Sequence, residues 1–184
     1  MAVNREWLEA FEAWLPKLQE AIPSALESVT RSRVGVVGVA LYTDADASTL
    51  IPAALTRKHR GELAAEYPDY AELYAWDPDE WDLQLPADQA GVLDPLMAKV
   101  RMLAPEVGEE NWRSFTIMAW IWMTEGMKNL AQEGFFETTY PGANVSFWIT
   151  DYRPHVDTMI EWVELLNPPA RSALYVAWLR ENGL

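Results

Sequence analysis

The sequence between Arg33 and Thr43 reads VGVVGVALY (residues 34–42) and decides the fold class. Four of these nine residues are valines, and no charged residue interrupts the run. A short, continuous, β-branched run is typical of a strand that is buried on both faces. Gly35 and Gly38 leave room for a helix or an aromatic ring to approach the strand closely. We therefore expect a buried strand here.

Three further segments are predicted as strands, at residues 49–55, 72–76 and 144–150. The last reads NVSFWIT and has the strongest strand composition of the three, whereas Pro52 marks the first as an edge or a bulge. Helical patterns surround these segments. The order predicts an α+β fold, in which a small sheet (strands near 34–42, 49–55, 72–76 and 144–150) is covered by several helices. A length of 184 residues fits a single domain over residues 1–184.

Apolar residues recur at three- and four-residue spacing between residues 4 and 28, which predicts helix. Pro16 and Pro23 lie inside this region, so we expect two or three short helices rather than one. A central helix is predicted near 109–133, where FTIMAWIWM (115–123) is apolar all round and should be buried on most sides. That run could line a ligand cavity, although ordinary core is the commoner outcome. The other predicted helices cover 57–66, 87–103, 154–166 and, with Asn167 as N-cap, 168 to the C-terminus.

The chain carries a net charge of −14 and has no cysteine. This charge disfavours nucleic acid and anionic membranes as partners and fits a basic protein partner. The acidic N-terminal segment does not resemble a signal peptide, and residues 115–123 are about half of the ~20 residues that span a bilayer. We expect a cytoplasmic protein.

The negative charge is concentrated between residues 61 and 98, which hold ten acidic residues and no lysine or arginine. Its densest part reads YPDYAELYAWDPDEW (67–81). Asp77, Pro78 and Glu80 have a structural explanation as a helix start, and Trp76 and Trp81 are interpreted as packing residues. The predicted contact residues for a basic partner are therefore Tyr67, Asp69, Tyr70, Glu72, Asp79 and Asp82.

A second candidate site follows the first strand, where Asp44-Ala45-Asp46-Ala47-Ser48 is similar to the opening motif of haloacid-dehalogenase-type phosphatases. That resemblance implies an aspartate nucleophile, an aspartate acid/base and Mg²⁺. Asp151 follows another predicted strand and could join Asp44 and Asp46 as a metal ligand. The alternative interpretation is a turn in which Asp and Ser side chains bond to the local chain. Neither His59 nor His155 has a partner at metal-ligand spacing.

Several short motifs resemble a bacterial family of domains of unknown function, the 4303 group. They are Ala40–Asp46, Trp76–Trp81, Gly134-Phe135, Asp151 and Asn167-Pro168. The resemblance covers roughly Val34 to Pro168 and leaves the N-terminal helical region and the C-terminal helix outside. Members of that kind of family occur among immunity proteins encoded beside secreted polymorphic toxins, and the resemblance carries no catalytic residues.

The resemblance implies a non-catalytic immunity protein that binds and occludes one toxin, and the local acidity adds that this toxin is basic. We therefore expect no enzymatic activity, cofactor or metal, and leave the oligomeric state open. The alternative is a small Mg²⁺-dependent phosphohydrolase that uses Asp44 and Asp46.

Overall fold

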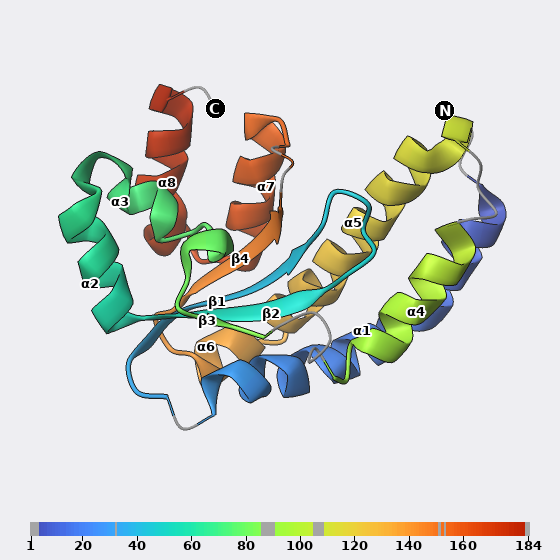
Figure 1. Ribbon diagram of the computed structural model, residues 1–184, viewed down its shortest axis with the longest axis horizontal. Helices are drawn as coiled ribbons and strands as arrows, with labels where there is room; N and C mark the ends of the chain where they lie inside the picture. The colour runs from blue at the N-terminus through green and yellow to red at the C-terminus, as the bar shows by residue number, and fades with distance from the viewer. Residues whose placement is uncertain are drawn as a thin grey trace.

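A computed structural model describes residues 4–31, 33–85, 91–104, 109–150, 152 and 154–182. In these ranges the chain forms eight α-helices, two short 3₁₀ helices and a four-stranded mixed sheet (Figure 1). The α+β prediction is therefore confirmed. The elements are α1 (Arg5–Thr30), β1 (Val36–Thr43), β2 (Ile51–Thr56), α2 (Arg57–Glu66), η1 (Pro68–Tyr70), α3 (Ala71–Tyr74), η2 (Pro78–Glu80), β3 (Leu83–Gln84), α4 (Asp94–Leu103), α5 (Glu109–Gln132), α6 (Phe135–Thr139), β4 (Asn144–Ile149), α7 (Val156–Leu166) and α8 (Pro169–Asn182).

The strand order in the sheet is β3-β2-β1-β4. The VGVVGVALY segment supplies β1, which pairs antiparallel with β2 and parallel with β4. The strands predicted at 34–42, 49–55 and 144–150 are thus confirmed as β1, β2 and β4. Gly38 lies where a Cβ would come within 3.0 Å of the Trp81 ring, so this glycine permits the close aromatic approach that the sequence predicts.

The strand predicted at 72–76 is wrong. Residues 71–74 form helix α3, and the fourth strand is β3, which pairs with Ala53 and Ala54 of β2. Leu73 and Trp76, three residues apart, both pack into a core shared with α7 and α8. One helical turn places two such residues on the same side, whereas a strand would point them to opposite faces.

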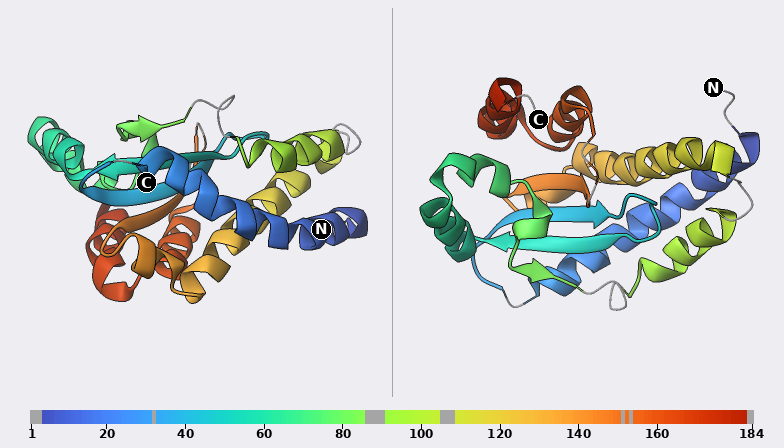
Figure 2. Two further views of the ribbon diagram at one scale, coloured as in Figure 1. Left: turned by 90° about the horizontal axis from the view of Figure 1, so that it is seen from below. Right: turned by 45° about the horizontal axis from the view of Figure 1, so that its top comes forward.

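Side chains of the strands alternate between the two faces of the sheet, and both faces are buried. Val39 and Leu41 of β1 and Phe147 of β4 contribute to the core that α1 and α5 cover, and α1 runs across this side of the sheet (Figure 2). Ala40 of β1 packs with Trp81, and Trp148 of β4 packs with α7 and α8. Helices therefore cover both faces, as the apolar character of β1 predicts.

Helix α1 is a single helix from Arg5 to Thr30 with both prolines inside it, so the prediction of two or three short helices is wrong. A proline costs about 3 kcal/mol relative to alanine inside a helix. Packing outweighs that cost here, because α1 buries a continuous stripe against α5 and the sheet: Trp7, Phe11, Leu18, Ile22, Ala25, Leu26 and Val29. Pro16 is exposed and Pro23 half-buried, so neither ring displaces the stripe.

The central helix is α5, and most of its predicted apolar run is buried, including Phe115, Trp122 and Met123. One side is not covered: the Ile121 side chain is 58% exposed. Helix α4 begins at Asp94, and residues 87–90 of its predicted range lie outside the described residues. Among the described residues, no helix has the length and apolar composition that crossing a membrane requires.

The prediction that Asn167 caps the N-terminus of α8 is wrong, because α8 begins at Pro169. The Asn167 side chain instead bonds to β4 and α7. Its side-chain carbonyl accepts a hydrogen bond from the Val145 amide at 2.8 Å. Its side-chain amide donates to the Val145 carbonyl at 2.7 Å and to the Val163 carbonyl at 3.0 Å. One buried side chain therefore ties the edge strand β4 to the end of α7.

Candidate functional site

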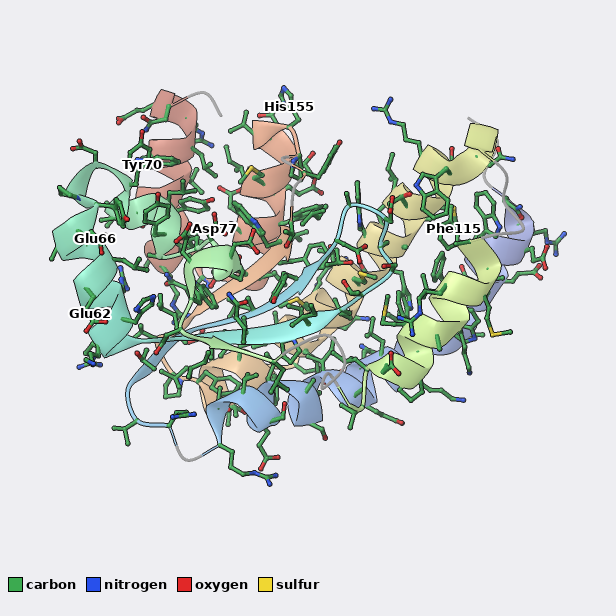
Figure 3. All side chains as sticks on the ribbon, in the orientation of Figure 1. Glu62, Glu66, Tyr70, Asp77, Phe115 and His155 are labelled. Atoms are coloured by element: carbon green, nitrogen blue, oxygen red, sulfur yellow. The ribbon has the colours of Figure 1, made fainter. Side chains whose placement is uncertain are left out.

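The strongest candidate site is a largely exposed group of acids and tyrosines on α2, η1 and α3. We call it the acidic–tyrosine face, and it comprises Glu62, Glu66, Tyr67, Asp69, Tyr70 and Glu72. Figure 3 shows Glu62, Glu66 and Tyr70 at the end of the molecule that α2 and the following turn form. Four of the six contact residues predicted from the sequence lie together here: Tyr67, Asp69, Tyr70 and Glu72.

Local sequence explains why this face is exposed. Thr56 caps the N-terminus of α2, because its hydroxyl accepts a hydrogen bond from the His59 amide. Leu63 is the buried residue of α2, so this helix anchors through a small apolar contact and leaves its other sides to solvent. Pro68 then begins η1 and turns the chain away from α2.

The tyrosines of the face are exposed but held in place. The Tyr67 side chain is 41% exposed and that of Tyr70 is 52% exposed. Both rings contact Tyr74, which is half-buried: Tyr67 meets it edge-on at 5.4 Å between ring centroids, and Tyr70 stacks on it at 6.0 Å. The Glu66 carboxylate accepts a hydrogen bond from the Tyr67 hydroxyl and raises the pKa of Tyr67. Because these contacts already restrict both rings, the rings should lose little further conformational entropy when they bind a partner.

The acids of the face differ in what they already contact. Glu62 lies 3.4 Å from both Lys58 and His59, and Glu72 accepts a hydrogen bond from the Trp76 indole at 3.3 Å. Asp69 has no side-chain hydrogen bond or ion pair with any residue that the structure describes. It is therefore the acid most available to a basic partner.

Asp79 and Asp82, the other two predicted contact residues, lie outside this face and bond within the fold; Asp79 belongs to η2, and Asp82 lies just before β3. Asp79 accepts a hydrogen bond from the Thr150 hydroxyl at 3.0 Å. Asp82 accepts from the Thr56 amide at 3.0 Å and from its hydroxyl at 2.8 Å. Both side chains remain exposed, so they add to the negative potential while holding β4 and the start of α2. As predicted, Asp77 caps a helical turn, because its carboxylate accepts from the Asp79 amide at 3.0 Å.

The Asp44 segment forms the turn that was the alternative interpretation. The Asp44 carboxylate accepts hydrogen bonds from the Ser48 amide at 2.7 Å, the Ser48 hydroxyl at 2.6 Å and the Thr49 hydroxyl at 2.8 Å. Asp46 accepts from the Trp112 indole at 3.2 Å, and Asp151 lies outside the described residues. Within the described ranges, no group of three His, Cys, Asp or Glu side chains is placed to hold a metal ion.

We expect Asp44→Ala to lower the free energy of unfolding by about 2–3 kcal/mol, because a half-buried carboxylate with three donors is removed. Asp44→Asn keeps one acceptor and should lose about half as much. Urea unfolding followed by circular dichroism measures both. Equal stability of all three proteins would show that the turn contributes nothing to stability.

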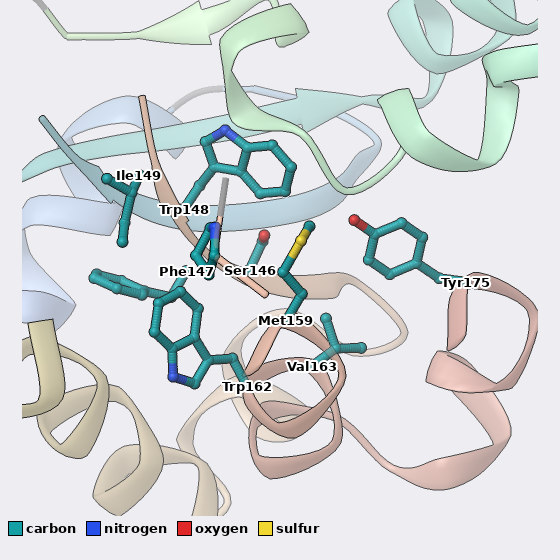
Figure 4. Close-up of a pocket in the computed structure, with 9 residues that line it drawn as sticks. Ser146, Phe147, Trp148, Ile149, Met159, Trp162, Val163 and Tyr175 are labelled. Carbon is teal, nitrogen blue, oxygen red and sulfur yellow. The ribbon is translucent and has the colours of Figure 1, made fainter. Parts of the chain in front are cut away.

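The aromatic core between β4, α7 and α8 contains a cavity that is too small for a ligand. It has a volume of about 10 Å³ and is lined by residues of β4, α7 and α8, among them Trp148, Trp162 and Tyr175 (Figure 4). A cavity needs about 10–15 Å³ to hold a single water molecule. This aromatic cluster is therefore core.

A larger groove, of about 580 Å³, runs between α5 and α7. Ile117, Trp120 and Ile121 of the predicted apolar run line one wall, and Trp162 and Leu165 of α7 line the other. A cavity along residues 115–123 was the less common alternative to core in the sequence analysis, and three residues of that run line this groove. The second wall, from α7, was not predicted.

The chain belongs to the family described as domain of unknown function DUF4303, whose model matches residues 18–168. The match begins within α1, at Leu18, so the boundary predicted at Val34 is too late, whereas the end at Pro168 is confirmed. No curated protein and no solved structure gives a significant match to the chain.

Proposed function

We propose that this chain is a binding protein that captures a basic protein partner. We further propose that it is a cytoplasmic immunity protein, which neutralises a secreted bacterial toxin by occluding it. The observation that supports the proposal best is the pair of exposed, fixed tyrosines, Tyr67 and Tyr70, on either side of Asp69. Aromatic anchors beside uncompensated charge are the features that concentrate binding energy in protein interfaces.

Electrostatics supports the same class of partner. A net charge of −14 attracts a basic protein over a range set by the ionic strength and raises the association rate. The basic residues of α2, Arg57, Lys58 and Arg60, lie near its start, whereas Glu66 is its last residue and Tyr67, Asp69, Tyr70 and Glu72 follow its end. The partner's lysines and arginines would therefore meet the η1 side of the face rather than the start of α2.

The test is binding to the protein encoded by the adjacent gene in the native host. We expect Asp69→Lys to weaken that binding about tenfold, and Tyr70→Ala about tenfold as well. Glu12→Lys on α1 makes the same charge change at an exposed site far along the chain from the face, and should leave binding within about twofold. Isothermal titration calorimetry gives the affinities, and binding should weaken as salt is raised.

Two results would contradict the proposal. If Asp69→Lys and Glu12→Lys bind the partner equally well, the acidic–tyrosine face is not the contact surface. If neither the adjacent gene product nor any other protein of the host is retained by the wild-type chain, the binding function itself is wrong.

A further inference from the structure

We propose that the groove between α5 and α7 is a docking site for an amphipathic helix of a partner protein, one that carries aliphatic side chains flanked by a basic residue. The inference does not rest on the immunity function, because the groove is a separate surface. Helix α8 contacts both α3 and α7, so it lies between the acidic–tyrosine face and the groove (Figure 1).

The shape of the groove suits an additional α-helix packed between α5 and α7. The wall from α5 extends from Ile117 to Lys128, which is about 16 Å or three helical turns. Its lining residues recur at the spacing i, i+3, i+4 and i+7, and so do those that α7 presents between Thr158 and Leu165. Two such walls form the groove into which the apolar stripe of a third helix packs. The Ile121 and Leu165 side chains are 58% and 38% exposed, so apolar surface is available there.

The same wall contains a buried polar group for which the described residues supply no hydrogen-bond partner. The Trp120 indole nitrogen makes no hydrogen bond with the described residues, although the side chain is only 9% exposed. The Trp122 indole nitrogen also lacks one, but that ring packs against Phe11 in the core, 5.3 Å away, whereas Trp120 lines the groove. Tyr152 packs against the Trp120 ring with 5.0 Å between the ring centroids, so the two rings together form part of the groove's apolar surface.

The charges around the groove select a basic occupant. Lys128 is bound to Glu125, with both carboxylate oxygens 3.0 Å from its ammonium nitrogen. Glu161 on the opposite wall is exposed and has no ion pair with a described residue. Among the described residues that line the groove, Glu161 therefore supplies a negative charge without an ion pair beside apolar side chains, which complements a lysine or arginine at the edge of an aliphatic stripe.

The test uses a fluorescein-labelled 18-residue peptide of leucine and lysine, with leucines at i, i+3, i+4 and i+7, added to the full chain. We expect fluorescence anisotropy to show binding that Ile121→Lys weakens at least tenfold. Leu174→Lys is the matched control, because Leu174 on α8 is also exposed, at 73%, and the charge change is the same. It should leave the affinity within about twofold.

Further measurements separate the groove from general attraction of a basic peptide to an acidic chain. A peptide of the same composition with the leucine spacing scrambled should bind at least tenfold more weakly. In ¹⁵N-labelled protein, the indole signal that Trp120→Phe removes should shift when the ordered peptide binds. Equal binding of both peptides, no binding, or an unchanged Trp120 signal would overturn the proposal. Self-association that Ile121→Lys abolishes would identify a second copy as the occupant and would overturn it too.

Discussion

Replacing Asn167 with leucine should lower the free energy of unfolding by about 3–4 kcal/mol. The substitution removes three hydrogen bonds and leaves the amide and carbonyl of Val145 without those partners inside the protein. Each buried polar backbone group left unsatisfied costs about 1–3 kcal/mol. Leucine has nearly the shape of asparagine, so the loss arises from the hydrogen bonds rather than from a change in volume.

Asn182→Leu provides the control, because the Asn182 amide makes an exposed hydrogen bond to the Trp178 carbonyl at 2.8 Å near the end of α8. It should change the stability by no more than about 0.5 kcal/mol. Guanidinium unfolding gives both values, and hydrogen exchange should show that the Val145 amide loses protection in Asn167→Leu alone. A loss for Asn167→Leu no larger than that for Asn182→Leu would show that β4 does not depend on this side chain.

Gly126→Val should cost about 3 kcal/mol, because α1 and α5 approach each other closely around this glycine. A Cβ at Gly126 would lie 2.8 Å from Leu18 Cδ2 and 3.4 Å from Ile22 Cδ1, and both of those side chains are fully buried. Overpacking of this kind forces a backbone shift or unfavourable rotamers and costs about 1–3 kcal/mol or more. Valine is branched at Cβ and cannot turn both methyl groups away.

The same substitution at Gly61 tests the helix propensity alone. Gly61 lies in α2, and no atom lies within 4 Å of the position that a Cβ would occupy there, so Gly61→Val should change the stability by less than about 0.5 kcal/mol. Leu18→Ala should cost less in the Gly126→Val background than in the wild-type protein, because the smaller side chain relieves the overlap. Urea unfolding of the wild type, the three single variants and the double variant measures these differences, and additive effects of Leu18→Ala and Gly126→Val would contradict the steric explanation.

The main strands and most helices could be predicted because their signals are local. β1, β2 and β4 are indicated by composition, the spacing of apolar residues indicates α1, and the continuous apolar run 115–123 indicates α5. What could not be predicted depends on contacts between distant segments. Strand β3 is two residues long and exists because β2 offers an unpaired edge, and α1 stays continuous through Pro16 because α5 covers its other side.

The candidate site also has a part that local sequence predicts and a part that depends on contacts between distant segments. Its local part, Tyr67 to Glu72, stays together because the residues are adjacent and Pro68 sets the turn. Asp79 and Asp82 could not be separated from it by sequence, since their partners, Thr150 and Thr56, are 71 and 26 residues away. The second wall of the groove could not be predicted for the same reason, because only the position of α7 shows which side of α5 remains uncovered.

The stacking of Trp76 on Tyr175 connects the acidic–tyrosine face to the C-terminal helix α8. The two rings lie 5.1 Å apart and within 9° of parallel, and Tyr175 belongs to α8, which follows the last residue of the family match. Helix α3, whose Tyr74 positions Tyr67 and Tyr70, thus rests on a C-terminal segment that the family model does not include. If the acidic–tyrosine face binds the proposed basic partner, we expect substitutions in α8 to change that fit by shifting Tyr67 and Tyr70 together, while every residue of the face stays the same.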